Sequence, residues 1–396
     1  MPVPAATGAV SVSAGGAHTC AALENGAVLC WGRNTNGQLG LGVSSNTVEM
    51  PTPVPGLQDA IAVATAGART CALLASGEAA CWGDDDLGTL GIGVPLDRNA
   101  PTPVVSLVDA VQSDAGLYGT CALRANGRLV CWGQNDLLGR GGSNNALTPS
   151  EVFGVDDAVM VSAGGAEGPP TESHTCVLQR DGGVRCFGSH QKGQLGDGRD
   201  YGNNAIPVDV AIDAVDAISL GARHSCALRA GRVLCWGDDS KGQIGGGGPR
   251  RSPVDVGISN VVDVAAGEET TCAVHVDGTV SCWGKEVYSG ATQVPTEVSS
   301  ITDAQAVTVG SAHVCVLHED GRVSCWGDGT SWQLGNGTMD SSATPVQVQG
   351  LEDAIAISAG RVHTCALRET KTVVCWGWGA AGQLGHGATS ASGVPV

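Results

Sequence analysis

Sixteen cysteines in eight regularly spaced pairs are the feature that most limits how this chain can fold. In seven pairs nine residues separate the two cysteines, in the other pair eight do, and the first cysteines recur every 43 to 55 residues. Such a period is typical of a propeller or a solenoid rather than of two unrelated domains. The pairs are Cys20 with Cys30, Cys71 with Cys81, Cys121 with Cys131, Cys176 with Cys186, Cys226 with Cys235, Cys272 with Cys282, Cys315 with Cys325, and Cys365 with Cys375.

Each pair lies in a unit built from the same parts. A short alternating apolar stretch precedes HTCAL or a variant, and a glycine turn, V-x-CWG, a GQLG-like loop and a Pro-Val pair follow. Alternation with period two predicts strands, and 60 glycines disfavour long helices. Eight units fill the chain without a linker, which predicts a single all-β domain. The approximate repeats are 3–53, 54–103, 104–151, 152–207, 208–253, 254–297, 298–345 and 346–396.

The spacing within a pair predicts a β-hairpin. Placing Cys20 opposite Cys30 centres the loop on Asn25, and Gly26 follows, as three-residue loops require at their left-handed position. In the eighth unit, residues 369–371 lack this glycine, so a strained or different turn is expected there.

The fifth unit tests the register. It has lost one residue, which leaves the two-residue loop Ala230-Gly231. The deletion still keeps Cys226 directly opposite Cys235, so the loop shortens while the strand pairing is preserved.

Opposed residues on antiparallel strands can lie about 4.5 Å apart at Cα, within the range that a disulfide spans. One disulfide per hairpin is therefore expected, each contributing somewhat under ~3 kcal/mol in the chain-entropy model. Buried free thiols are the first alternative. Zinc is the second alternative, although two thiolates would fill only half of its tetrahedral coordination.

Disulfides imply an extracellular, cell-surface or periplasmic location. The start MPVPAATGAV has no signal peptide, which we interpret as a mature or trimmed chain.

The stretch GGAHTCAALENGAVLCWGRNTNGQLGLG resembles the regulator of chromosome condensation repeat, and similar units cover the whole chain. The resemblance implies a β-propeller with four-stranded blades. Members of that family have seven blades, whereas eight units predict eight here, with seven as the alternative. Cysteines at both hairpin positions are similar to crinkly-type receptor ectodomains and to secreted bacterial members.

The family's chromatin member binds nucleosomes and exchanges nucleotide on a small GTPase, but no residue set for exchange can be matched here. A secreted bacterial member inhibits β-lactamases through an aromatic-lined face, which implies protein binding as the nearer precedent.

Charge excludes several classes of partner. The chain has 21 basic and 39 acidic residues and a net charge of −18. Nucleic acid and anionic membrane surfaces both require a basic face. No apolar run approaches the ~18 residues of a membrane span, so no membrane insertion is expected.

A histidine at the HTC position recurs in five units. A ring of histidines could suggest a metal site, but Arg69, Gly119 and Thr270 replace it elsewhere, so hydrogen bonding within each blade is expected instead. His190 and His386, in loops, are expected to be solvated. No catalytic triad and no P-loop stand out, so we expect no enzyme, no cofactor and no metal. The five histidines at the HTC position are His18, His174, His224, His313 and His363.

The tryptophans of CWG belong to the repeat and are expected to pack in the core, so the aromatic residues outside the repeat are the main candidates for binding. Tyr288, Trp332 and Trp378 fall in the same loop type of units six, seven and eight and could form one patch. Packing into local gaps is the alternative. Tyr118 and the insertion 165–173 form a second, weaker candidate surface.

Acidic residues lie in the same type of loop as Trp332 and Trp378, the loop after the second cysteine of a repeat. Asp84, Asp85 and Asp86 resemble a calcium loop weakly and lack its final glutamate, so turn formation is the expected role. With Asp238 and Asp239 they predict an acidic rim, which favours a basic partner.

The sequence thus predicts a monomeric, non-catalytic propeller that binds a protein whose identity it does not give. A lectin-like binder of glycans or small ligands and an enzyme in the central channel are alternatives. An intracellular regulator of a small GTPase is a further alternative if the cysteines are reduced.

Overall fold

The computed structural model describes residues 6–116, 118–134, 138–142, 144–165, 173–199, 202–285 and 293–396. They form an all-β propeller with eight blades, seven of them four-stranded sheets and one three-stranded. The expected fold and the count of eight blades rather than seven are confirmed. Within the described residues there is no helix that could cross a membrane.

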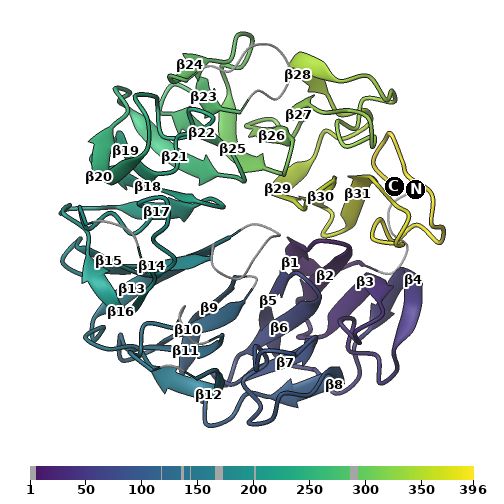
Figure 1. Ribbon diagram of the computed structural model, residues 1–396. Helices are drawn as coiled ribbons and strands as arrows, with labels where there is room; N and C mark the ends of the chain where they lie inside the picture. Colours follow the sequence, from purple (N-terminus) through teal and green to yellow (C-terminus); the bar gives the residue numbers. More distant parts are fainter. Residues whose placement is uncertain are drawn as a thin grey trace. The chain divides into compact units, whose positions relative to one another are not determined.

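The strands fall into two compact units of several blades each. The first unit consists of Met1–Asp86, Pro95–Val108 and Ala304–Val396 and contains four blades (Figure 1). In each blade the strands pair in chain order, antiparallel throughout. The strands are β1 (Ala9–Ala14), β2 (His18–Leu23), β3 (Val28–Asn34), β4 (Ser45–Pro53), β5 (Ala60–Ala66), β6 (Arg69–Leu74), β7 (Ala79–Gly83), β8 (Arg98–Pro103), β25 (Ala304–Val309), β26 (His313–His318), β27 (Val323–Gly327), β28 (Ser342–Gln347), β29 (Ala354–Ala359), β30 (His363–Arg368) and β31 (Val373–Gly377).

The second unit consists of Leu87–Val94 and Asp109–Asp303 and contains the remaining four blades. Its strands are β9 (Ala110–Ala115), β10 (Gly119–Arg124), β11 (Leu129–Gly133), β12 (Ala146–Glu151), β13 (Ala158–Gly164), β14 (His174–Gln179), β15 (Val184–Gly188), β16 (Asn204–Asp209), β17 (Ala217–Leu220), β18 (His224–Arg229), β19 (Arg232–Gly237), β20 (Arg250–Asp255), β21 (Val261–Ala266), β22 (Thr270–His275), β23 (Val280–Gly284) and β24 (Thr296–Glu297).

The C-terminal residues complete the three-stranded blade. Val396 exchanges two backbone hydrogen bonds with Cys375 on β31, at 3.0 and 3.2 Å. Ser392 and Gly377 exchange two more, at 3.0 and 2.9 Å. The last residues of the chain therefore satisfy the outer edge of β31, which would otherwise be open.

The cysteine hairpins have the predicted register. In all eight blades the two cysteines are direct cross-strand partners, including those of the shortened fifth hairpin. Each pair forms a disulfide with Cα atoms 4.1 or 4.2 Å apart, so one disulfide per blade is confirmed. The bonds join Cys20 to Cys30, Cys71 to Cys81, Cys121 to Cys131, Cys176 to Cys186, Cys226 to Cys235, Cys272 to Cys282, Cys315 to Cys325, and Cys365 to Cys375.

The disulfides lie in the cores between neighbouring blades. Cys20, Cys30 and Leu39 of the first blade are fully buried and pack in one cluster with Ala72 and Trp82 of the second. The same arrangement joins other neighbours within each unit. Each of these five disulfides therefore stiffens a hairpin and also fills the contact between two blades of one unit.

Two hairpin turns depart from the three-residue pattern, as expected. In the fifth blade Ala230 and Gly231 both have positive φ, 48° and 74°, as a two-residue turn of type I′ requires. In the eighth blade Lys371 has φ 59° where Gly26 has 78°. Lys371 is therefore held in a conformation that costs a side-chain-bearing residue about 1 kcal/mol.

Replacing Lys371 with glycine should stabilise the fold by up to about 1 kcal/mol, because the left-handed strain disappears. The exposed ion pair of Lys371 with Glu24 would be lost, but such pairs contribute little. Urea unfolding with the disulfides intact measures the effect, and Glu24→Gln isolates the contribution of the ion pair. A Lys371→Gly variant less stable than Glu24→Gln would contradict the assignment of strain.

Candidate functional site

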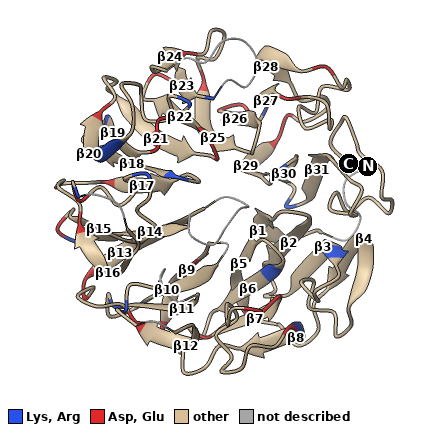
Figure 2. Cartoon of the chain, in the orientation of Figure 1, with Lys and Arg blue, Asp and Glu red and all other residues tan. Residues whose placement is uncertain are grey.

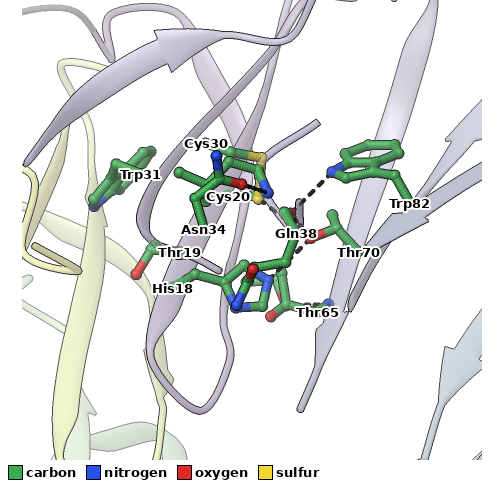
Figure 3. Close-up of a disulfide and its surroundings, with 12 residues drawn as sticks. His18, Thr19, Cys20, Cys30, Trp31, Asn34, Gln38, Thr65, Thr70 and Trp82 are labelled. Atoms are coloured by element: carbon green, nitrogen blue, oxygen red, sulfur yellow. Dashed lines mark hydrogen bonds between the residues drawn. A yellow bond between two sulfur atoms is a disulfide. The ribbon is translucent and has the colours of Figure 1, made fainter. Parts of the chain in front are cut away.

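The loop after the third strand of a blade is here called the post-tryptophan loop. In the part of the chain that the structure describes, six of these loops are each built around one backbone carbonyl. The Gln38 carbonyl, after β3, accepts hydrogen bonds from Thr70 Oγ1 at 2.8 Å and Trp82 Nε1 at 2.9 Å, both from the next blade (Figure 3). His18 Nε2 lies 2.9 Å from Thr70 Oγ1. Since the threonine hydroxyl donates to the carbonyl, the imidazole N–H donates to the hydroxyl, and the chain of donors runs from one blade to the next.

The same arrangement recurs in both units. It assigns the tryptophans of CWG a structural role, as the sequence predicted. It also corrects the expectation that the HTC histidines bond within their own blade, because each reaches the neighbouring one. Other acceptors and their donors are Thr89 with Thr120 and Trp132, Gln194 with Ser225 and Trp236, Gln243 with Thr271, Gln333 with Trp376, and Gln383 with Thr19 and Trp31.

Burial keeps these histidines neutral. A side chain at Gly15 would come within 2.9 Å of the His18 ring, so the glycine provides the room for the imidazole. Desolvation lowers the pKa of His18, His224 and His313 to about 4, and that of His174 and His363 to about 3. These neutral imidazoles serve as polar contacts between blades.

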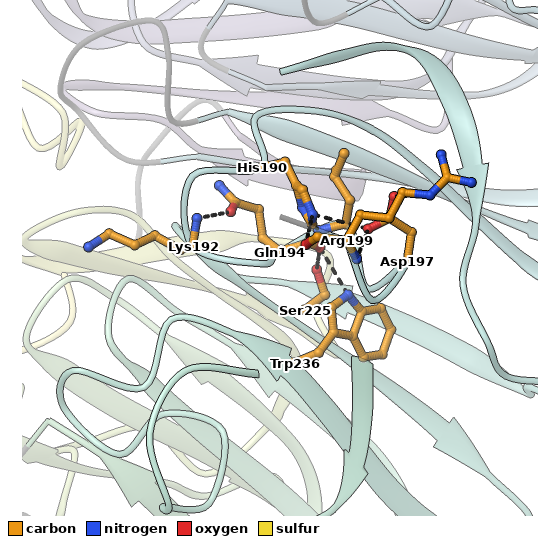
Figure 4. Close-up of polar contacts among 8 residues, drawn as sticks. His190, Lys192, Gln194, Asp197, Arg199, Ser225 and Trp236 are labelled. Carbon is orange, nitrogen blue, oxygen red and sulfur yellow. Dashed lines mark hydrogen bonds and ion pairs between the residues drawn. The ribbon is translucent and has the colours of Figure 1, made fainter. Parts of the chain in front are cut away.

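His190 is buried, so the expectation that it is solvated was wrong. Its Nδ1 accepts the Leu195 N–H at 3.3 Å, and its Nε2 lies 3.0 Å from Asp197 Oδ1 and 3.1 Å from the Arg199 carbonyl (Figure 4). The imidazole holds the loop that presents the Gln194 carbonyl. His386 is half-buried, and its Nε2 lies 3.1 Å from Ser390 Oγ.

Trp332 occupies the glycine position of its loop and adopts φ 67°. It is half-buried, and its ring lies directly over Gly393 in the C-terminal segment, where an added side chain would overlap it. Part of the ring thus packs within the protein and part remains accessible.

Trp378 follows β31 and is also half-buried, with its backbone N–H bonded to the Val362 carbonyl at 2.9 Å. Trp332 and Trp378 occupy equivalent loops of two blades of one unit. Tyr288 lies outside the described residues, and so do residues 166–172 of the insertion. Tyr118 is half-buried. The aromatic patch remains a prediction.

The acidic loop after β7 has two distinct parts. Asp85 is fully buried and accepts the Leu96 N–H at 3.2 Å, so it braces the loop and does not belong to an exposed rim. Asp84, Asp86 and Asp97 bring one carboxylate oxygen each within 4.8 Å of one another. Burial, with Asp86 and Asp97 nearby, raises the pKa of Asp84. Behind them lies buried Arg69, whose pKa burial lowers to about 10 against the opposing effect of Asp84 and Asp85.

These carboxylates therefore balance a buried guanidinium. Figure 2 shows the red loop after β7 next to the blue segment of β6. Sequence reasoning missed Arg69 as their counterpart, although its replacement of the HTC histidine was visible. It missed Asp97 because ten residues separate it from Asp86 in the chain.

Asp238 and Asp239 are also buried. Asp239 accepts the N–H groups of Ile244 at 3.1 Å and Gly248 at 2.8 Å. The two aspartates therefore brace their loop and do not form the acidic rim that the sequence predicted.

The buried histidines predict a loss of stability in mild acid. An imidazole with a folded pKa of about 3 to 4 and an unfolded value of 6.5 is protonated first in the unfolded state. Stability is complete above pH 6.5 and falls as the pH drops toward 4, by up to about 1.4 kcal/mol per pH unit per histidine. Urea unfolding between pH 7.5 and 5 measures this, and His313→Gln should reduce the slope. A free energy of unfolding that stays constant across that range would contradict it.

Two models of the regulator of chromosome condensation (RCC1) repeat match the chain. The first matches residues 9–38, 111–137, 215–243, 261–289, 304–332 and 354–383. The second matches 25–74, 181–228, 230–274 and 320–367. Together they cover most of the chain.

Known proteins agree with this assignment. The human E3 ubiquitin-protein ligase HERC2 is 31% identical over 325 residues, which are 76% of this chain and 7% of that protein. The chain spans half or less of the length of its curated relatives. Yeast Prp20p superposes with a TM-score of 0.66 at 22% identity, covering 85% of this chain and 90% of its own. Human WBSCR16 gives 0.69 at 18%, covering 87% and 98%. The matches to both repeat models show that this chain belongs to the RCC1 repeat family.

Proposed function

We propose that this chain is a non-catalytic protein-recognition propeller that works outside the cytoplasm. Protein binding is supported by the relatives of this chain, because yeast Prp20p binds Gsp1p and histones and forms a complex with Kap60. The buried histidines, serines and threonines of this chain take part in contacts between blades, which leaves them unsuited to act on a substrate.

The observation that carries the proposed extracytoplasmic location is the set of eight disulfides, five of which lie in cores between neighbouring blades of one unit. A disulfide that fills a core is shielded from reductants and persists in oxidising compartments. Two reduced thiols would also need more room than a bonded pair in these closely packed clusters.

The recognition surface of this proposal is the loop side of the first unit, meaning the ends of its strands from which the post-tryptophan loops extend. Trp332 and Trp378 are partly accessible there, and Asp86 and Asp97 are exposed. Tryptophan is favoured as an interface anchor, and nearby carboxylates speed association with a basic partner.

Intact mass after thiol blocking under denaturing conditions tests the location. The expected result is no blocked cysteine among the 16, with a mass 16 hydrogens below that of the reduced chain. Sixteen blocked thiols would overturn the extracytoplasmic proposal and favour a small-GTPase regulator inside the cell.

Cross-linking on the surface of the cells that make the protein identifies the partner of the wild type. The double variant Trp332→Ala with Trp378→Ala should no longer capture that partner, because the two anchors are removed. Val108→Ala, which changes an exposed aliphatic residue in the linker after β8 at the opposite strand ends, is the matched control. Thermal unfolding shows whether the loss of Trp332 packing on Gly393 disturbs the fold. Capture of the same protein at wild-type affinity by a folded double variant would remove this surface.

A further inference from the structure

A β-bulge at the start of the first strand of most blades turns one aliphatic side chain out of the core. In β1 the pairing slips between Ala9 and Ser11, so Val10 has no cross-strand partner. The slips in β5 and β29 leave Ile61 and Ile355 in the same situation. Such bulges are often used to redirect a side chain.

These side chains are exposed although they are large and apolar. Val10 is 46% exposed, Ile61 53% and Ile355 49%, while the alanine before each is buried. The corresponding residues Val111, Val159 and Val262 of the second unit are exposed as well. Six of eight blades share the feature, so it belongs to the repeat and is not an isolated exposed residue, which would need no explanation.

In the first unit three of these residues are on consecutive blades. Strand β1 contacts β5 on one side and β29 on the other. Ser13 Oγ and Thr65 Oγ1, 2.9 Å apart, join β1 to β5 further along. Val10, Ile61 and Ile355 therefore form a row, which we name the bulge arc. It lies on the hairpin side of the unit, at the strand ends opposite the post-tryptophan loops.

The charge around the bulge arc is one-sided. On this side of the first unit the described cations are all paired: Lys371 with Glu24, Arg368 with Asp353 and Arg322 with Asp320. Exposed carboxylates in the same turns and linkers have no ion pair among the described residues. These are Asp59, Glu78, Glu319, Glu352 and Glu369.

We propose that the bulge arc docks a basic segment of a partner protein in which aliphatic side chains alternate with lysine or arginine. The inference rests on the proposed role in protein recognition and adds a second surface to it. The aliphatic row takes the apolar side chains, and the five carboxylates take the cations. A second copy of this chain would bring like charges together, and an anionic lipid surface would be repelled. Sugars are disfavoured because the row has no aromatic face.

The probe is a short fluorescent peptide of alternating lysine and leucine, titrated against the whole disulfide-bonded chain. A lysine–serine peptide and a glutamate–leucine peptide test apolar character and charge separately, and both should bind much more weakly. The triple variant Val10→Thr, Ile61→Thr and Ile355→Thr keeps the branching at Cβ and should lower affinity by about tenfold or more. The double variant Val43→Thr with Met50→Thr, which changes exposed residues outside the arc, is the matched control and should bind as wild type.

The charge contribution is measured with the double variant Asp59→Asn with Glu352→Gln, which should weaken binding at low salt and flatten its salt dependence. Absence of probe binding by the wild type, or unchanged affinity in the triple variant, overturns the docking surface. Neither result affects capture through Trp332 and Trp378, so the proposed function fails or stands by its own experiment.

Discussion

The backbone carbonyl that six described post-tryptophan loops present to the next blade is the contact on which the rest of the structure depends. At Gln38 it accepts an indole N–H and a hydroxyl from the next blade, and a histidine of its own blade donates to that hydroxyl. Four polar groups are thereby satisfied inside an apolar interface, where any one left alone would cost about 1–3 kcal/mol. These contacts therefore favour one register of packing between the first and second blades.

The disulfides reinforce the same interfaces. Cys20 and Cys30 fix their own hairpin, but their sulfur atoms also lie in the cluster that receives Trp82. Thr70 Oγ1 is 3.8 Å from Cys20 Sγ, so the polar contact and the disulfide share one space (Figure 3). Because the covalent bond is placed beside the contact between blades, hairpin order and blade packing are coupled.

The residues that hold the blades together are buried, and the accessible side chains lie at the ends of the strands, where recognition is proposed. Polar side chains of the kinds used in catalysis, such as His18 and Asp85, hold loops and blades together here. Residues outside the repeat, such as Trp332, and residues displaced by a bulge, such as Val10, are the ones left partly or largely accessible. Both ends of the strands in the first unit carry more acid than base, so a basic partner suits either.

The sequence by itself determined the blade count, the hairpin register and the pairing of Cys20 with Cys30, because these depend on turn length and on residues close in the chain. It predicted that the CWG tryptophans are structural but placed the HTC histidines in the wrong contact. Only the tertiary structure decided that Trp82 and Thr70 meet Gln38, that Asp97 joins Asp84, and that Val10 points outward. The first two are contacts between residues of different blades or distant parts of a loop, and the third depends on a β-bulge. The spacing of residues along the chain does not determine which side chains meet when the blades pack, nor where a bulge redirects a side chain.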